Sequence, residues 1–223
     1  MDQIQTERLF DLSHTLAKDM LTSCLYPWEA LSKIADTIRE IGKGLSHEEY
    51  DRIAEDVWIA KDATVASSAS ISGPCIIGHR TQVRHCAYIR GSVLVGDDCV
   101  VGNSCELKNT IVFDRAQIPH FTYVGDSILG YRAHTGAGAI TSNVKSDKTL
   151  VTLRTPDGKL ETGLKKFGAM IGDRVEIGCG CVLNPGVIIG RDTSIYPLTS
   201  VRGILPPESI CKSPDCIVKK IQK

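Results

Sequence analysis

The chain has 223 residues, of which 42% are hydrophobic, and its 26 basic side chains balance its 26 acidic ones. This composition is ordinary for one elongated domain with a small appendage, and the balanced charge gives no electrostatic case for binding nucleic acid. No apolar run approaches the roughly 18 residues of a membrane span, and the N-terminus lacks the basic and apolar regions of a secretory signal. We therefore expect a cytoplasmic protein with neither a nucleic-acid nor a membrane partner.

The first part of the chain, residues 1–50, has apolar side chains at helical spacing. This spacing predicts one helix over residues 9–25 and a second over residues 29–41. Pro27 lies just before the second helix and Gly42 just after it, which are favoured positions for these two residue types. The segment is too short for a catalytic domain, so we interpret it as an N-terminal helical appendage.

From Ile59 onward an aliphatic residue returns every six positions, with a small residue two positions before most of them. The aliphatic series comprises Ile59, Val65, Ile71, Ile77, Val83, Ile89, Val95, Val101 and Leu107, then Ile171, Ile177, Leu183, Ile189, Ile195 and Val201. The small series comprises Ala63, Ala69, Cys75, Thr81, Ala87, Val93, Cys99 and Cys105, then Ala169, Val175, Cys181, Val187, Thr193 and Thr199. A period of six fits neither an α-helix nor an ordinary sheet, but it is typical of a parallel β-helix built from hexapeptide repeats. The sequence therefore predicts an all-β solenoid whose equivalent positions stack about 18 residues apart.

The repeat is irregular in two places. After Leu107 two faces are one residue short, because the inward series continues at Val112, Ile118, Val124, Leu129 and Thr135. Over residues 142–167 the period stops, and two β-prone stretches flank residues 155–158, Thr-Pro-Asp-Gly, which predicts a projecting β-hairpin. We therefore predict a β-helix over residues 51–204 with this insertion, followed by an irregular cap over residues 205–223.

Nine cysteines raise the question of disulfides or zinc. Cys75, Cys99, Cys105 and Cys181 fall in the small inward series, where a reduced thiol packs as a small hydrophobe. Cys179 and Cys181 are separated by one residue and have no second pair to complete a tetrahedral site. We predict neither a disulfide nor a structural metal.

The densest cluster of reactive side chains lies in three segments around the short faces, residues 106–109, 118–126 and 136–143. These segments resemble the acetyltransferase domain of the bifunctional N-acetylglucosamine-1-phosphate uridyltransferase/glucosamine-1-phosphate acetyltransferase family, and of its archaeal sugar-1-phosphate counterparts. The resemblance covers residues 57–214. It implies a left-handed β-helix, a homotrimer, and acetyl-CoA as co-substrate.

The resemblance also assigns catalytic roles. His120 corresponds to the family's base, Glu106 to its acidic partner and Asn143 to an active-site asparagine. A histidine suits this task, because an amine that attacks a thioester becomes cationic and must lose a proton near neutral pH. Ala137 corresponds to a residue whose backbone amide faces the thioester carbonyl, and Cys179 lies in the coenzyme region.

Arg90 and Lys108 are 18 residues apart, so they should stack on the same edge, where two cations favour an anion. The resemblance implies that both bind the substrate's phosphate together with Tyr123. Lys148 is a further candidate from the loop. Lys145 is its alternative, because the spacing between Asn143 and Lys148 is one residue shorter than in the family. His134 stands where the bacterial enzymes carry a sugar-contacting asparagine.

Our first hypothesis is an acetyl-CoA-dependent N-acetyltransferase that acts on glucosamine 1-phosphate or galactosamine 1-phosphate in UDP-N-acetylhexosamine biosynthesis. The alternative is a non-catalytic β-helix subunit that scaffolds or regulates a separate sugar nucleotidyltransferase, because we expect this chain to lack a nucleotidyltransferase domain. A third class, the zinc carbonic anhydrases built on the same β-helix fold, needs three convergent histidines. His79 and His85 are six apart and so fall on successive faces, which disfavours that class.

Overall fold

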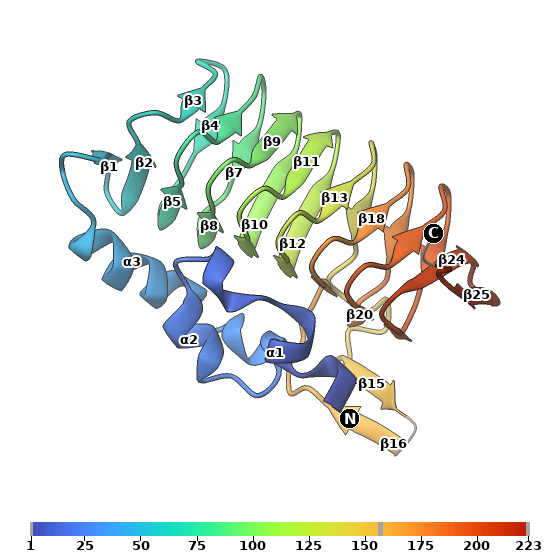
Figure 1. Cartoon of the computed structure of the whole chain (residues 1–223). Coiled ribbons are helices and arrows are strands. Elements are labelled where there is room, and N and C mark those ends of the chain that lie inside the picture. The colour runs from blue at the N-terminus through green and yellow to red at the C-terminus, as the bar shows by residue number, and fades with distance from the viewer. Residues whose placement is uncertain (1, 156–157, 222–223) are drawn as a thin grey trace.

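The computed structural model describes residues 2–155 and 158–221, which form a β-helix with short helices along one side (Figure 1). Its strands stack in parallel on three faces, which we call A, B and C. Face A comprises β2 (Val57–Ala60), β5 (Cys75–Ile77), β8 (Val93–Val95), the second halves of β10 (Glu106–Val112) and β12 (Tyr123–Leu129), β17 (Ala169–Ile171), β20 (Val187–Ile189) and β23 (Ile204–Leu205). Face B comprises β3 (Thr64–Val65), β6 (Gln82–Val83), β9 (Val100–Asn103), β11 (Gln117–His120), β13 (His134–Thr135), β18 (Glu176–Ile177), β21 (Ser194–Ile195) and β24 (Ser209–Ser213). Face C comprises β4 (Ser70–Ile71), β7 (Tyr88–Ile89), the first halves of β10 and β12, β14 (Ile140–Thr141), β19 (Val182–Leu183) and β22 (Ser200–Val201).

The two short faces are the point where the coil changes geometry. Tyr88 pairs with Glu106, an offset of 18 residues (106 − 88), whereas Glu106 pairs with Tyr123, an offset of 17 (123 − 106). β10 and β12 run without interruption from face C into face A, and each bends at one residue in the left-handed region, Asn109 and Asp126, both with φ of 48°. The missing residue therefore replaces an ordinary corner by a bend within a strand.

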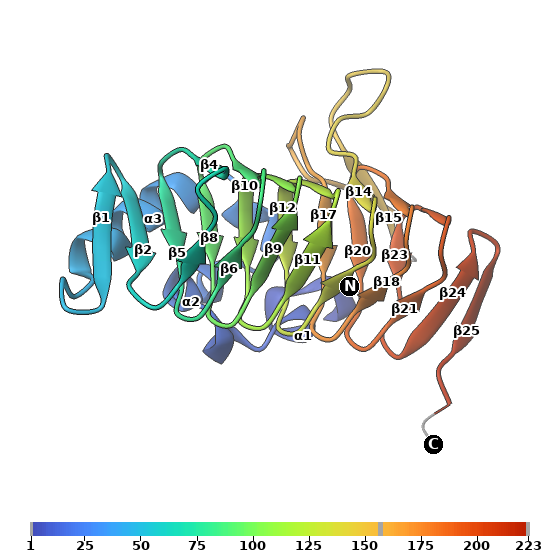
Figure 2. The ribbon, with the colours of Figure 1, turned by 90° about the horizontal axis from the view of Figure 1, so that it is seen from above.

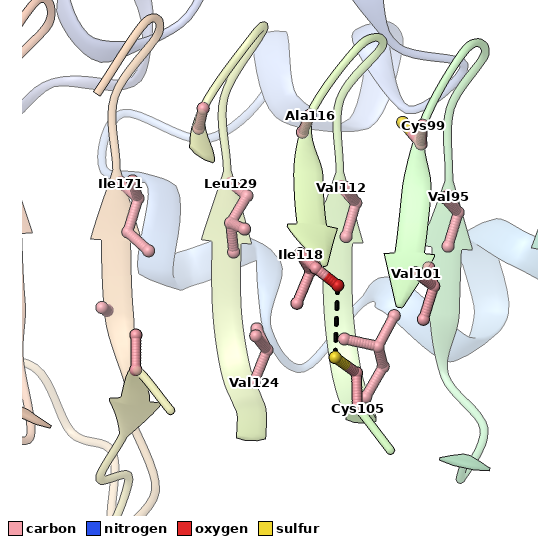
Figure 3. Packing of buried hydrophobic residues seen from close by; sticks show 14 of the residues in the cluster. Val95, Cys99, Val101, Cys105, Val112, Ala116, Ile118, Val124, Leu129 and Ile171 are labelled. Atoms are coloured by element: carbon pink, nitrogen blue, oxygen red, sulfur yellow. Dashed lines mark hydrogen bonds between the residues drawn. The ribbon is translucent and has the colours of Figure 1, made fainter. Parts of the chain in front are cut away.

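The period-six prediction of the core is confirmed. Both inward series line the inside of the coils, and all their members from Cys75 onward are buried (Figure 3). The four cysteines predicted to pack as small hydrophobes are buried and free. The Cys105 thiol donates a hydrogen bond to the carbonyl of Ile118 at 3.2 Å, so even this sulfur is satisfied within the stack.

The coil corners demand small residues where one coil approaches the next. A Cβ placed on Gly102 would lie 1.6 Å from the carbonyl oxygen of Pro119, one coil further on. We expect Gly102→Ala to lower the free energy of unfolding by about 3 kcal/mol, the upper end of the range for overpacking, because backbone atoms cannot yield as a side chain does. Gly44→Ala is the control, since nothing lies within 4 Å of that position. Equal urea midpoints for the two variants would contradict this packing account.

The N-terminal segment consists of short pieces rather than two helices. They are η1 (Asp2–Ile4), α1 (Thr6–Leu9), η2 (Leu12–His14), α2 (Lys18–Thr22), η3 (Pro27–Ala30) and α3 (Ile34–Gly44). The helix predicted over residues 9–25 is therefore wrong, while the second predicted helix is confirmed in its C-terminal part as α3. The break arises because backbone groups here bond to the coil: the Leu9 carbonyl accepts from the Asp173 amide and the His14 carbonyl from the Asp114 amide, both at 3.1 Å.

These pieces form a strap, residues 2–44, that covers the outside of face A (Figures 1 and 2). The outward side chains of that face are apolar and buried: Ile76, Leu94, Ile111, Ile128, Met170 and Ile188. They share a second hydrophobic cluster with Phe10, Leu21, Trp28, Ile34 and Ile38 of the strap. Face A is thus covered within the same chain.

The ends of the predicted solenoid also differ in detail. β1 (Tyr50–Ala54) precedes the coil and pairs antiparallel with β2. The irregular cap predicted from residue 205 is wrong for its first part, since β23 and β24 continue the parallel stacks before β25 (Cys216–Lys219) turns back antiparallel on β24.

The predicted insertion is confirmed as a hairpin. β15 (Thr152–Thr155) pairs antiparallel with β16 (Gly158–Glu161). Pro156 and Asp157, the central residues of the predicted turn, lie outside the described residues.

Candidate active site

Stacking of the coils places three predicted site residues in one column at the corner between faces B and C. The Gly138 amide donates to the His120 carbonyl at 3.2 Å, and the Gly180 amide donates to the Ala137 carbonyl at 2.9 Å. His120, Ala137 and Cys179 therefore follow one another along this edge, and the His120 side chain is exposed. The predicted base and both predicted coenzyme residues are brought together.

A second group lies on face C. Tyr88, Glu106 and Tyr123 are in register on three neighbouring coils and form one column. Arg90 lies two residues after Tyr88, and Lys108 lies two residues after Glu106. The Arg90 amide donates to the Leu107 carbonyl at 2.9 Å, which places Arg90 next to Lys108 along the stack. The predicted stacking of these two cations on one edge is therefore confirmed.

Both cations of this group have carboxylate partners. The Arg90 guanidinium donates to Glu106 Oε1 at 2.6 Å, and this hydrogen bond raises the pKa of the arginine. Lys108 Nζ lies 3.6 Å from Asp126 Oδ2. Within the described residues Glu106 contacts Arg90, and no hydrogen bond or ion pair joins it to His120.

Asp126 is the site residue to which the sequence analysis assigned no role. Its side chain is only 6% exposed, and its Oδ1 accepts from Asn109 Nδ2 at 2.9 Å. Its Oδ2 accepts from Asn143 Nδ2, which also donates to the Tyr123 hydroxyl at 3.2 Å. The available signal was its place on a short face, where the repeat departs from its period.

Tyr123 keeps its proton in this setting. Burial raises the pKa of its phenol, and the negative charges of Asp126 and Glu106 raise it further. The phenol is therefore a neutral hydrogen-bond donor at physiological pH.

One predicted substrate contact lies away from face C. His134 is on face B, where its Nδ1 lies 2.9 Å from Glu176 Oε2. It lines a surface hollow together with Arg115 and Arg132. In a single chain the structure does not bring His134 to the cluster around Asp126.

The two loop lysines are placed differently from one another. Lys145 lines a groove between the loop and the last coils, where it donates to Thr149 Oγ1 at 2.6 Å and lies 3.3 Å from Asp147 Oδ2. Lys148 is exposed and is not among the residues that line this groove. Of the two alternatives, Lys145 is the one that faces the coils.

Two negative findings concern the described residues only. No group of three or more histidine, cysteine, aspartate or glutamate side chains among residues 2–155 and 158–221 is arranged to hold a metal ion. No helix in these ranges is long and apolar enough to cross a membrane.

Comparison with known proteins agrees with the repeat and the fold. Residues 71–152 match the family described as GMPPB C-terminal domain, and residues 168–203 match the bacterial transferase hexapeptide (six repeats). The fold is a left-handed β-helix built from hexapeptide repeats.

Individual relatives cover only parts of this chain. The bifunctional protein GlmU of Methanococcus vannielii is 38% identical over 52% of this chain and 28% of its own length. The bifunctional sugar-1-phosphate nucleotidylyltransferase/acetyltransferase of Sulfurisphaera tokodaii is 35% identical over 41% of this chain and 23% of its own length. Among solved structures, the N-acyltransferase AntD of Bacillus cereus, in complex with dTDP and 3-hydroxybutyryl-CoA, shares 18% identity with a TM-score of 0.42, covering 83% of this chain and 88% of that one. The aligned regions span about a quarter of the two curated relatives.

Proposed function

We propose that the chain is an acetyl-CoA-dependent N-acetyltransferase that acts on an amino-sugar 1-phosphate. The observation that carries this proposal is the alternation of charge on face C: Arg90 and Lys108 are each paired with a carboxylate, Glu106 and Asp126 respectively. A purely anionic ligand would be attracted by the two cations but repelled by the two carboxylates beside them. An amino-sugar phosphate carries an ammonium and a phosphate, so both signs of charge find partners.

The corner column supports acyl transfer beside this cluster. His120 has no side-chain hydrogen bond among the described residues, and its exposed imidazole is free to accept the proton that the attacking amine loses. Within the same ranges, the amide of Ala137 donates no hydrogen bond to the chain, so it is free to donate to the oxyanion that forms on the thioester carbonyl. Nitrogen–carbon bond formation and loss of the coenzyme thiol then complete the transfer.

The proposal is tested by thiol release from acetyl-CoA. We expect release with glucosamine 1-phosphate or galactosamine 1-phosphate. We expect none with glucosamine, which lacks the phosphate, or with N-acetylglucosamine 1-phosphate, which lacks the free amine. If neither amino-sugar phosphate gives thiol release, the proposal is overturned.

A homotrimer accompanies this proposal, because the strap covers face A and leaves faces B and C for contacts between copies. Large apolar side chains are exposed on or beside face C, namely Tyr88, Phe121, Ile140, Val182 and Leu198. In a trimer, face B of one copy, with His134, would approach face C of the next. Light scattering should give three times the mass of one chain, and a monomer at micromolar concentration would contradict this assembly.

A second function is favoured by one observation. The two curated relatives described above are much longer than this chain, and one is named for both nucleotidylyl and acetyl transfer. A non-catalytic subunit that scaffolds a separate nucleotidyltransferase would explain this match as well. Co-purification with such an enzyme, without thiol release, would favour this reading. The cytoplasmic location stays a prediction.

A further inference from the structure

Asp126 makes more contacts within the cluster than any residue whose role was predicted from the sequence. The residue as a whole is 4% exposed, and it lies at the bend of β12 in the left-handed conformation. Asn109, Asn143 and Lys108 all direct nitrogen atoms toward its carboxylate. Its carbonyl also accepts from the Gly168 amide at 2.8 Å, which fixes the return from the loop insertion.

The direction of these hydrogen bonds follows from Asp126 being a carboxylate. An ionised carboxylate only accepts, so Asn143 must turn its amino group, and not its carbonyl, toward Asp126. The same amino group also donates to the Tyr123 hydroxyl. Among the described residues, Asn143 Oδ1 is therefore left as a free acceptor and the Tyr123 hydroxyl proton as a free donor.

We propose that Asp126 is a positioning residue that fixes the amide orientation of Asn143 and, through it, the donor direction of Tyr123, while it holds Lys108 beside them. This inference rests on the proposed function. One acceptor, one hydroxyl donor and one cation then face the substrate in a set arrangement. An amino-sugar phosphate supplies the matching groups, an N–H donor and phosphate oxygens.

A neutral residue at this position loses the constraint. An asparagine in place of Asp126 offers both a donor and an acceptor, so Asn143 can turn either way and Tyr123 can donate inward. Lys108 also loses its counter-charge. The substitution nearly preserves volume, which separates the effect on polarity from an effect on packing.

We expect Asp126→Asn to lower kcat about 10²-fold, the loss typical of a small misplacement of reacting groups. The KM for acetyl-CoA should be unchanged, because the coenzyme residues lie on the corner column. Adding Asn143→Ala to Asp126→Asn should cost little more, since the two residues act as a unit. Asp192→Asn is the matched control, because Asp192 also lies at a left-handed corner, with φ of 60°, in an ion pair with Arg174.

A second variant protects the test against simple misfolding. Asp126→Glu adds volume but keeps an acceptor-only group, so it should recover more activity than Asp126→Asn. If the loss came from packing alone, the larger glutamate would be the worse of the two. Greater activity of the asparagine variant would therefore overturn the proposal, as would full additivity with Asn143→Ala.

A readout that does not need turnover separates this inference from the proposed function. In a neutron crystal structure, which distinguishes the amide oxygen from the deuterated amide nitrogen, we expect Asn143 of Asp126→Asn to adopt both amide orientations. An Asn143 amide and a Tyr123 hydroxyl that keep the wild-type orientation would overturn the positioning role. Failure of the wild-type protein to release thiol would instead overturn the proposed function, and the crystallographic comparison would still decide the role of Asp126.

Discussion

His120→Ala should lower kcat/KM for the amino-sugar phosphate by about 10²- to 10⁴-fold, the range for loss of a general base. The amine cannot be acylated productively unless its proton is removed, and His120 is the exposed imidazole beside Ala137 in the corner column. Steady-state thiol release measures the effect. The fold of the chain should be unaffected, because the side chain makes no hydrogen bond within the described residues.

The matched control for this prediction is His85→Ala. His85 is an exposed histidine on the same edge, two coils before His120. Its carbonyl accepts from Asn103 Nδ2 at 3.0 Å, and Asn103 pairs in register with His120 on the next coil. His85 Nδ1 lies 2.6 Å from Ser68 Oγ, so His85 belongs to the local structure of an earlier coil. We expect nearly wild-type turnover. Equal losses for the two alanine variants would remove the special role of His120.

Leu94→Asp should lower the free energy of unfolding by at least about 3 kcal/mol, since a buried leucine is lost and a charge is placed without a partner. Leu94 is 1% exposed on the outside of β8, where α3 of the strap packs against it. Urea unfolding measures the loss. Limited proteolysis should then cut within the strap, because the apolar surface of face A on which the strap packs carries a charge.

Val100→Asp controls for the introduction of a charge on a coil. Val100 points outward on face B and is only half-buried, with Gln82 and Gln117 as neighbours in register. Because face B is a proposed contact between copies, the two variants are compared in dilute samples in which the chain is monomeric, where Val100→Asp should remain close to the wild type in stability. If Leu94→Asp and Val100→Asp unfold at the same urea concentration, the strap contributes nothing to stability.

The solenoid could be predicted from the sequence because its period is local and strict. Each inward residue, such as Val95 or Ile189, recurs at a spacing that no other regular structure has. The strap could not be predicted in the same way. Its backbone partners are remote, as where the Asp11 amide donates to the Asp173 carboxylate, 162 positions later. Short-range helical periodicity gives no information about such bonds.

The candidate site shows the same division. Register alone predicted that Arg90 lies beside Lys108. His120, Ala137 and Cys179 were assigned from the family resemblance, and their common edge comes from the structure. The period also contained a signal that His134 points outward, since it directly precedes the inward Thr135. The role of Asp126 and the Glu106–Arg90 pair depend on side-chain reach across coils, which the sequence does not encode in its spacing.

The most direct test of acyl transfer to nitrogen is the chemical identity of the product. Glucosamine 1-phosphate or galactosamine 1-phosphate is incubated with acetyl-CoA and the wild-type protein, and the sugar is analysed by mass spectrometry before and after hydroxylamine treatment. Our account predicts a singly acetylated sugar phosphate that resists hydroxylamine, as an amide does. A hydroxylamine-sensitive ester, or no acetylated sugar at all, would contradict it.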